Sequence, residues 1–205
     1  MDPDRPVYTI IERILRPILM LVYRVEITGR ENVPPTGPCV LAANHVSVMD
    51  GFFLAISTTR QVRFMAKEEL YRVPVVSQIL RAAGAFPVNR GGDAGRAVAS
   101  GVELLASGAV VGVFPEGTSL PDRKAGYRRG AARLALATAA PLIPVALVGT
   151  EFTLEPRTHR IRLPRVRIVI GEPIQVERRE PTEEAATKLT VRLQAAIAAL
   201  RARTG

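Results

Sequence analysis

The sequence predicts an α/β fold: a single-domain sandwich in which helices flank a mixed, mostly buried sheet, preceded by an N-terminal amphipathic helix. Short apolar segments, separated by Pro and Gly clusters, alternate along the chain with segments of helical periodicity. The 205 residues are 47% apolar and 23% charged, the size and composition of one globular domain with a sizeable core. No internal repeat or long linker indicates a second large domain.

The first predicted element is an amphipathic helix at the N-terminus. Its apolar positions recur with helical spacing at Val7, Ile10, Ile11, Ile14, Leu15, Ile18, Leu19 and Val22. Glu12, Arg13 and Arg16 occupy the other side, and a bend is expected at Pro17. Such a stripe packs against a protein core or lies in a bilayer interface with its cations near anionic headgroups. Both interpretations stay open, and each can hold for a different part of the helix.

Strands and helices alternate after this first helix, and this order predicts the sandwich around a mixed sheet. Strands are expected at residues 24–28, 39–43, 62–66, 86–89, 109–114, 142–148 and 166–170. Helices are expected from about residue 50 and at residues 74–83, 93–106 and 127–139.

A last helix is expected at the C-terminal end of the chain. Thr182 and two glutamates open it, and Arg201 and Arg203 lie in its last turn, the charge distribution that the helix dipole favours. We therefore divide the chain into an N-terminal amphipathic, membrane-associating helix, residues 1–23, and a main domain, residues 24–205.

The charge of the chain is strongly basic and comes almost entirely from arginine. Lys and Arg total 28 against 19 Asp and Glu, a formal net charge of +9, and only Lys67, Lys124 and Lys188 are lysines. Arginine binds phosphate bidentately, so the excess indicates an anionic partner or, alternatively, the codon bias of a GC-rich genome. Nucleic-acid binding is disfavoured, because the arginines are dispersed and only 5% of the residues are aromatic.

The cysteine content and the termini predict where the protein works. Cys39 is the only cysteine, so no intrachain disulfide forms and a reducing compartment is expected. The N-terminus lacks the basic region of a signal peptide, and no uncharged stretch reaches the roughly 20 residues of a membrane span. We expect a peripheral or monotopic protein on the cytoplasmic face of a membrane, with no transmembrane span and no signal peptide.

The segment from Asn44 to Asp50 contains the strongest candidate for catalysis. It follows a predicted strand and opens a helix, so the Asp50 carboxylate can fold back on His45. A neutral imidazole held in one tautomer by a carboxylate removes a hydroxyl proton near pH 7. The alternative is a structural histidine bonded to a helix-capping aspartate. A serine hydrolase is disfavoured because no Gly-x-Ser-x-Gly elbow surrounds Ser47, and a metal site because His159 is the only other histidine.

Two further clusters offer groups that bind a polar substrate. Arg90 follows a predicted strand beside two glycines, where its guanidinium can bind a phosphate. Glu116, Gly117 and Thr118 follow another strand and can hydrogen-bond a polyol. Taken alone, each cluster is better explained as an ordinary turn. A fourth cluster, Pro141 to Val145, indicates a short buried strand.

Together and in this order, the four clusters resemble the 1-acylglycerol-3-phosphate acyltransferase family, the glycerolipid acyltransferases with a His-x4-Asp motif. The resemblance spans roughly residues 40–148. It implies that His45 is the general base and Asp50 its partner, and that Arg90 belongs to the phosphate-binding motif. It also implies that Glu116 and Gly117 belong to the acceptor-binding Phe-Pro-Glu-Gly motif.

This chain departs from the family pattern at one position of the third motif. Ser119 stands where the family usually has an arginine, so Arg123, Lys124 or Arg128 is the candidate to supply the missing cation. The departure bears on which acceptor the enzyme takes. The resemblance implies acyl-CoA or acyl carrier protein as the acyl donor, a lysophosphatidate-type acceptor, a membrane lipid surface as partner, and no metal or other cofactor.

Two alternatives remain. The same machinery would acylate glycerol 3-phosphate or another lysolipid or glycolipid hydroxyl. A catalytically silent lipid-binding module would keep the fold and the N-terminal helix, but it would have no reason to retain both His45 and Asp50.

Overall fold

The computed structural model describes residues 11–67, 71–72, 74, 77–78, 80, 84–88, 94–117, 126–153 and 162–204. The strands are β1 (Glu26–Thr28), β2 (Cys39–Ala43), β3 (Val62–Lys67), β4 (Ala85–Val88), β5 (Val110–Val113), β6 (Leu142–Val148) and β7 (Arg167–Ile170). The α-helices are α2 (Arg16–Val22), α3 (Asp50–Ile56), α5 (Ala94–Ala106), α6 (Gly130–Thr138) and α7 (Glu183–Ala202). Most of the predicted helix at residues 74–83 lies outside the described residues.

The strands form one seven-stranded sheet in the order β1-β7-β6-β2-β5-β3-β4. The five strands from β6 to β4 run parallel to one another, whereas β7 pairs antiparallel with β6 and β1 runs parallel to β7. The sheet is therefore mixed, and the predicted fold class is confirmed.

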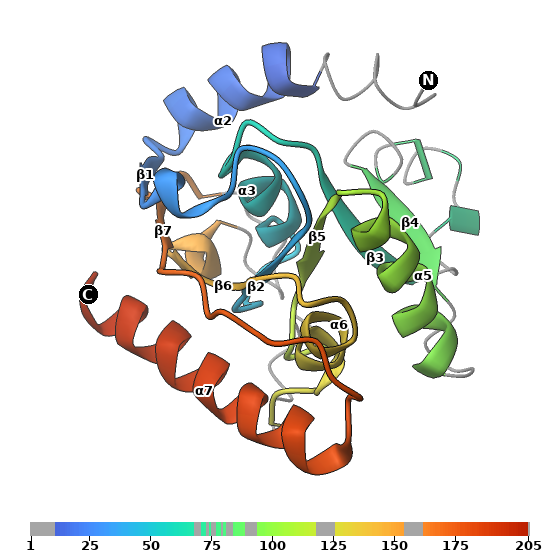
Figure 1. Ribbon diagram of the computed structural model, residues 1–205. Helices are drawn as coiled ribbons and strands as arrows, with labels where there is room; N and C mark the ends of the chain where they lie inside the picture. The colour runs from blue at the N-terminus through green and yellow to red at the C-terminus, as the bar shows by residue number, and fades with distance from the viewer. Residues whose placement is uncertain are drawn as a thin grey trace.

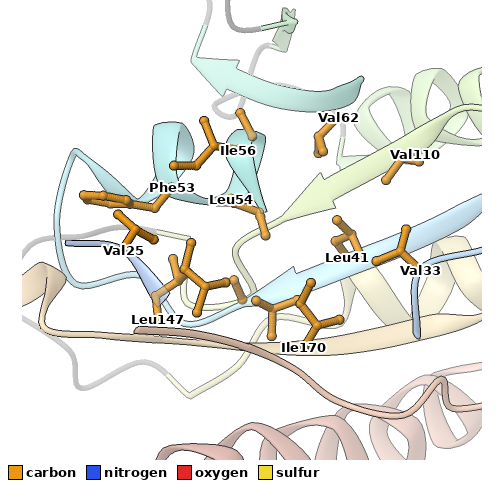
Figure 2. Close-up of a cluster of buried hydrophobic side chains, with 14 of the residues drawn as sticks. Val25, Val33, Leu41, Phe53, Leu54, Ile56, Val62, Val110, Leu147 and Ile170 are labelled. Carbon is orange, nitrogen blue, oxygen red and sulfur yellow. The ribbon is translucent and has the colours of Figure 1, made fainter. Parts of the chain in front are cut away.

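Helices cover both faces of the sheet. Every residue of β2 is buried, and its alternating side chains enter two separate cores. Leu41 belongs to the core beneath α2 and α3, which Figure 2 shows in close-up, and Val40 belongs to the core beneath α5, α6 and α7. In Figure 1, α2 and α3 accordingly lie on one side of the sheet, and α6 and α7 on the other.

One edge of the sheet gathers the segments that the sequence singled out. Ala43 at the end of β2 aligns with Val145 of β6, and Ala42 aligns with Val113 at the end of β5. Because these strands are parallel, the segments that follow β2, β5 and β6 leave the sheet together. Arg167 pairs with both Val148 and Glu26, so the start of β1, directly after α2, lies there too. We call this side of the sheet the carboxyl edge.

The N-terminal helix packs through part of its apolar surface. A π-helical turn at Ile11–Leu15 precedes α2, and the change of geometry falls beside Pro17, which has no amide N–H. Leu19 is buried and contacts the core, as do the half-buried Leu15, Met20 and Val22. The Tyr23 ring meets the Phe53 ring of α3 edge-on, with centroids 5.3 Å apart. These contacts fix α2 against the face of the sheet that α3 covers.

The apolar positions predicted for this helix divide between the core and the surface, because two of them, Ile14 and Ile18, point away from the core. Ile14 and Ile18 are 57% and 50% exposed, and Leu21 is 80% exposed. Together with the exposed Pro17, these side chains form a second, outward stripe at helical spacing. Within the described residues, no helix combines the length and the hydropathy that crossing a bilayer requires.

Several element boundaries differ from the prediction for reasons of tertiary structure. The strand predicted from Arg24 begins at Glu26, because Arg24 has a positive φ of 45° where the chain turns from α2 into the sheet. The helix predicted from Tyr127 begins at Gly130, because the Arg128 amide donates to the Pro115 carbonyl at 2.7 Å. The last helix begins as predicted, with the Thr182 hydroxyl accepting from the Ala185 amide.

Candidate active site

The loop between β2 and α3 is organised around one oxygen of Asp50. This residue is fully buried, and its Oδ2 atom accepts the Val46 amide at 2.6 Å and the Ser47 amide at 2.8 Å. The same oxygen lies 2.9 Å from Nδ1 of His45. The structure thus brings His45 and Asp50 into the contact that their spacing predicts. Two backbone N–H groups therefore donate to one oxygen of Asp50 and fix its position beside the His45 ring.

This contact determines which ring nitrogen of neutral His45 carries the proton. A carboxylate with no proton of its own accepts from Nδ1–H, so Nδ1 carries the proton in the neutral imidazole. The lone pair is therefore on Nε2. The His45 side chain is 19% exposed, so a substrate hydroxyl can approach it from the carboxyl edge. This is the arrangement of a general base.

The plane of the His45 ring is set by aromatic stacking. The ring lies on Phe114, with centroids 4.3 Å apart and planes 24° apart, and Phe114 stacks in turn on Phe64 of β3 at 6.3 Å. Gly112 makes room for this column, because a Cβ at that position would lie 2.5 Å from the Phe64 ring. The third sequence motif therefore supports the first: Phe114, which opens the Phe-Pro-Glu-Gly segment, orients the His45 ring.

Asn44 anchors the catalytic loop to the neighbouring strand. Its buried side-chain amide donates to the Leu147 carbonyl at 2.9 Å and accepts the Leu147 amide at 2.8 Å. The side chain thus continues the pairing of β2 with β6 one position beyond Ala43. Sequence reasoning assigned no role to Asn44, although a buried-strand pattern that ends in an amide side chain is a usable signal for such an anchor.

A second anchor joins Ser47 to the turn after β6. The Thr153 hydroxyl donates to the Thr150 carbonyl at 2.6 Å, so the Ser47 hydroxyl, 3.0 Å away, donates to Thr153. Ser47 Oγ also accepts the Met49 amide at 3.2 Å. Both partners of the Ser47 hydroxyl therefore engage it in fixing the loop, which agrees with the expectation that Ser47 is not a nucleophile. Thr153 was missed because it lies outside every motif.

The predicted acceptor-binding turn follows β5, next to the catalytic loop. The Gly117 amide donates to the Phe114 carbonyl at 3.0 Å, and Gly117 has a φ of 73°, which favours glycine. A Cβ at Gly117 would lie 2.7 Å from Nε of Arg128, so the Arg128 guanidinium lies directly over this turn. The Glu116 side chain is half-buried there.

Of the cations proposed to replace the missing arginine, Arg128 is the one that the structure describes, and it lies beside the motif. Arg123 and Lys124 fall outside the described residues, as do Thr118 and Arg90. Val88, the last residue of β4, pairs with Lys67 of the parallel strand β3. Arg90 therefore follows in sequence a strand that ends at the carboxyl edge.

Comparison with known proteins places this site in a family. The model of the acyltransferase family matches residues 24–148, more than half of the chain. A 1-acyl-sn-glycerol-3-phosphate acyltransferase of Bacillus subtilis (strain 168) is 30% identical over 168 residues, 82% of this chain and 82% of that protein. The chloroplastic enzyme BAT2 of Brassica napus, which has the same activity name, is 31% identical over 157 residues, 74% of this chain and 45% of that protein.

A solved structure shares the fold over the full chain. The crystal structure of PlsC from Thermotoga maritima, a 1-acyl-sn-glycerophosphate acyltransferase, superimposes with a TM-score of 0.75. It is 24% identical and covers 100% of this chain and 84% of that one. The region that the family model matches contains both the catalytic loop and the Phe114–Gly117 turn. The chain therefore belongs to the acyltransferase family, and its predicted kinship with the 1-acylglycerol-3-phosphate acyltransferases is confirmed.

Proposed function

We propose that the chain transfers a fatty acyl group from acyl-CoA or acyl carrier protein to the free hydroxyl of 1-acylglycerol-3-phosphate, which yields phosphatidate. The observation that supports this most directly is the 2.9 Å contact between Nδ1 of His45 and the buried Asp50 carboxylate. The contact provides a base whose lone pair is on Nε2. The relatives named for this activity supply the substrate class.

The reaction needs one base and no covalent enzyme intermediate. His45 Nε2 takes the acceptor's hydroxyl proton as the oxygen attacks the thioester carbonyl carbon. The tetrahedral intermediate then collapses, the C–S bond breaks, and the imidazolium returns the proton to the leaving sulfur. The products are an ester and a free thiol. Asp50 stabilises the imidazolium between the two steps, since its carboxyl group is hydrogen-bonded to the same ring.

The acceptor is held by the second and third motifs in this proposal. Arg90 binds its phosphate, and Glu116 with Gly117 and Thr118 positions its glycerol portion. Arg128 provides the cation that Ser119 lacks, because its guanidinium lies over Gly117. An acceptor without the phosphate would lose the arginine contacts and bind more weakly.

The enzyme works at a membrane surface in this proposal, because its acceptor and product are membrane lipids. Ile14, Ile18 and Leu21 form the outward stripe of the N-terminal helix, and the exposed Arg13 lies on the same helical segment. An apolar stripe flanked by a cation is suited to the interface of an anionic leaflet.

The decisive experiment measures thiol release from palmitoyl-CoA by the purified chain in liposomes. Lysophosphatidate, glycerol 3-phosphate and no acceptor are compared side by side, for the parent, for His45→Ala, and for His159→Ala as a control at the only other histidine. Release that depends on lysophosphatidate and on His45 supports the proposal. A preference for glycerol 3-phosphate would indicate that the chain acylates glycerol 3-phosphate, one step earlier, instead. If no acceptor stimulates thiol release, the result favours the alternative of a catalytically silent lipid-binding module.

A further inference from the structure

The exposed apolar side chains of this protein are unevenly distributed. Within the described residues, the large hydrophobic side chains that are exposed include three on the N-terminal helix and one, Val191, on α7. The remaining three are Val48, Phe152 and Leu163, which are 64%, 57% and 52% exposed. Val48 belongs to the loop after β2, whereas Phe152 and Leu163 both belong to the connection between β6 and β7; the two connections meet the sheet at the carboxyl edge, beside the candidate active site. We call these three residues the apolar rim.

Hydrogen bonds fix the loops of the apolar rim to one another. Val48 adjoins Ser47, and Phe152 adjoins Thr153; the hydroxyls of Ser47 and Thr153 lie 3.0 Å apart. Within the connection between β6 and β7, the Arg162 amide donates to the Thr153 carbonyl at 3.0 Å. The backbone next to Leu163 is therefore attached at Thr153 as well. The segments that hold the rim residues therefore have fixed positions relative to the loop that contains His45.

One residue of the apolar rim lies near the outward stripe of α2. The Arg24 guanidinium donates to the Leu163 carbonyl at 3.1 Å, and the Arg24 amide donates to the Leu21 carbonyl at 3.4 Å. Arg24 thus links the backbone at Leu163 to that of Leu21, the most exposed apolar residue of the helix. We call the stripe and the rim together the apolar border.

The charges around this border are mainly positive. Arg13, Arg24 and Arg162 are exposed on the same segments, against the half-buried Glu151 beside Phe152. The nearby Glu26 is paired with the exposed Arg165, so this pair adds no net charge. Separate apolar side chains on two loops, interspersed with arginines, match a fluid anionic surface better than a rigid protein partner, because lipid tails adapt to any outline.

We propose that Val48, Phe152 and Leu163 form a second membrane contact, distinct from the N-terminal helix, which inserts into an anionic bilayer and holds the His45 loop against it. The idea rests on the proposed function only in that the acceptor is a membrane lipid. With two contacts, the helix and the rim, the orientation of the enzyme on the bilayer is fixed, whereas a helix alone leaves it free to rotate about one attachment.

The chain offers a direct test because it contains no tryptophan. Phe152→Trp places a single fluorophore in the rim, and Val191→Trp places one at an exposed position on α7. With vesicles of phosphatidylglycerol and phosphatidylcholine, the emission of Phe152→Trp should move to shorter wavelength and be quenched by brominated lipid tails. Val191→Trp should show neither effect. Emission of Phe152→Trp that does not change while the protein sediments with the vesicles overturns the proposal.

A second measurement uses removal of the apolar groups. The double variant Phe152→Ser/Leu163→Ser should bind the same vesicles about tenfold more weakly, whereas Val191→Ser should bind as the parent does. Equal affinity of the double variant and the parent contradicts the proposal. A blue shift of Phe152→Trp that needs no vesicles but rises with protein concentration also contradicts it, because it indicates a second copy of the chain as the occupant.

The failure of this inference is distinguishable from failure of the proposed function. Both measurements report binding and need no turnover. Vesicle insertion of the rim in a protein without acyltransferase activity would keep the membrane contact and remove the proposed function. Full activity on lysophosphatidate with a rim that stays in water would keep the proposed function and remove the membrane contact.

Discussion

Two neighbouring segments at the carboxyl edge are held in place by different means. The loop after β2 is fixed by side chains: Asp50 gathers two amides and His45, and Asn44 pairs with Leu147. The turn after β5 is fixed by backbone, through the Gly117 amide to Phe114 and the Arg128 amide to Pro115. The comparison indicates that the loop of His45 depends on particular side chains, whereas the turn after β5 depends on its backbone.

The largest effect expected from this comparison is on turnover, at the base itself. His45→Ala should lower kcat by about 100-fold to 10,000-fold, the range for loss of a general base. Because the Asp50 carboxylate keeps both backbone donors, the loop should stay folded. Kinetics together with thermal unfolding check this. Near-parental turnover by folded His45→Ala would end the general-base assignment.

The next largest effect is expected at the anchor to β6. Asn44→Ala leaves the amide and carbonyl of Leu147 buried without partners, so the free energy of unfolding should fall by about 2–4 kcal/mol, and turnover should fall with it. Asn32→Ala is the matched control, since Asn32 makes one bond, to Ile170, at a half-buried position and should cost about 1 kcal/mol. Denaturant titration measures the free energy of unfolding of both variants. Equal losses would mean that the Asn44 hydrogen bonds contribute no more to stability than the single bond of Asn32.

A smaller effect is expected at the second anchor. Thr153→Val keeps the shape but removes the acceptor for Ser47, so we expect a loss of about 1–2 kcal/mol in unfolding free energy and roughly tenfold in kcat. Thr153→Ser should restore both values, because it retains the hydroxyl. The kcat of the valine variant should fall more than its KM rises, since a displaced base affects the chemical step. A parental kcat in Thr153→Val would show that the catalytic loop does not need this anchor.

The smallest effect is expected in the recognition turn. Arg128→Ala should raise the KM for lysophosphatidate about fivefold and leave kcat almost unchanged, because an exposed cation contributes mainly ground-state binding. Arg129→Ala is the control: this neighbouring arginine is paired with Glu183, and its loss should not change the KM. Equal effects of the two substitutions would indicate general attraction of an anionic substrate by the basic surface.

The sequence predicted best what depends on local pattern. The limits of β2 and β6 agree with the prediction, since both are continuous apolar runs. The contact of His45 with Asp50 follows from a five-residue spacing at the start of a helix. In contrast, the left-handed conformation of Arg24 depends on how α2 meets the sheet, and local propensity contains no information about it.

The distant partners of both anchors of the His45 loop could not be identified from the sequence. Asn44 and Leu147 are 103 residues apart, and Ser47 and Thr153 are 106 apart. No local rule pairs such distant positions; the register of β2 against β6 does so. Which part of the N-terminal stripe packs on the core was left open for a related reason, because the direction in which Ile14 and Ile18 point depends on the docking of Leu19.

Cys39 gives this protein a built-in chemical reporter. It is the only thiol, it opens the strand that leads to His45, and it is fully buried. Burial raises the pKa of the thiol to about 11, so at neutral pH it is both inaccessible and protonated. An alkylating reagent can label it only when β2 separates from its neighbours. The labelling rate therefore measures how often the central strand opens, and bound acceptor that stabilises the carboxyl edge should slow that reaction.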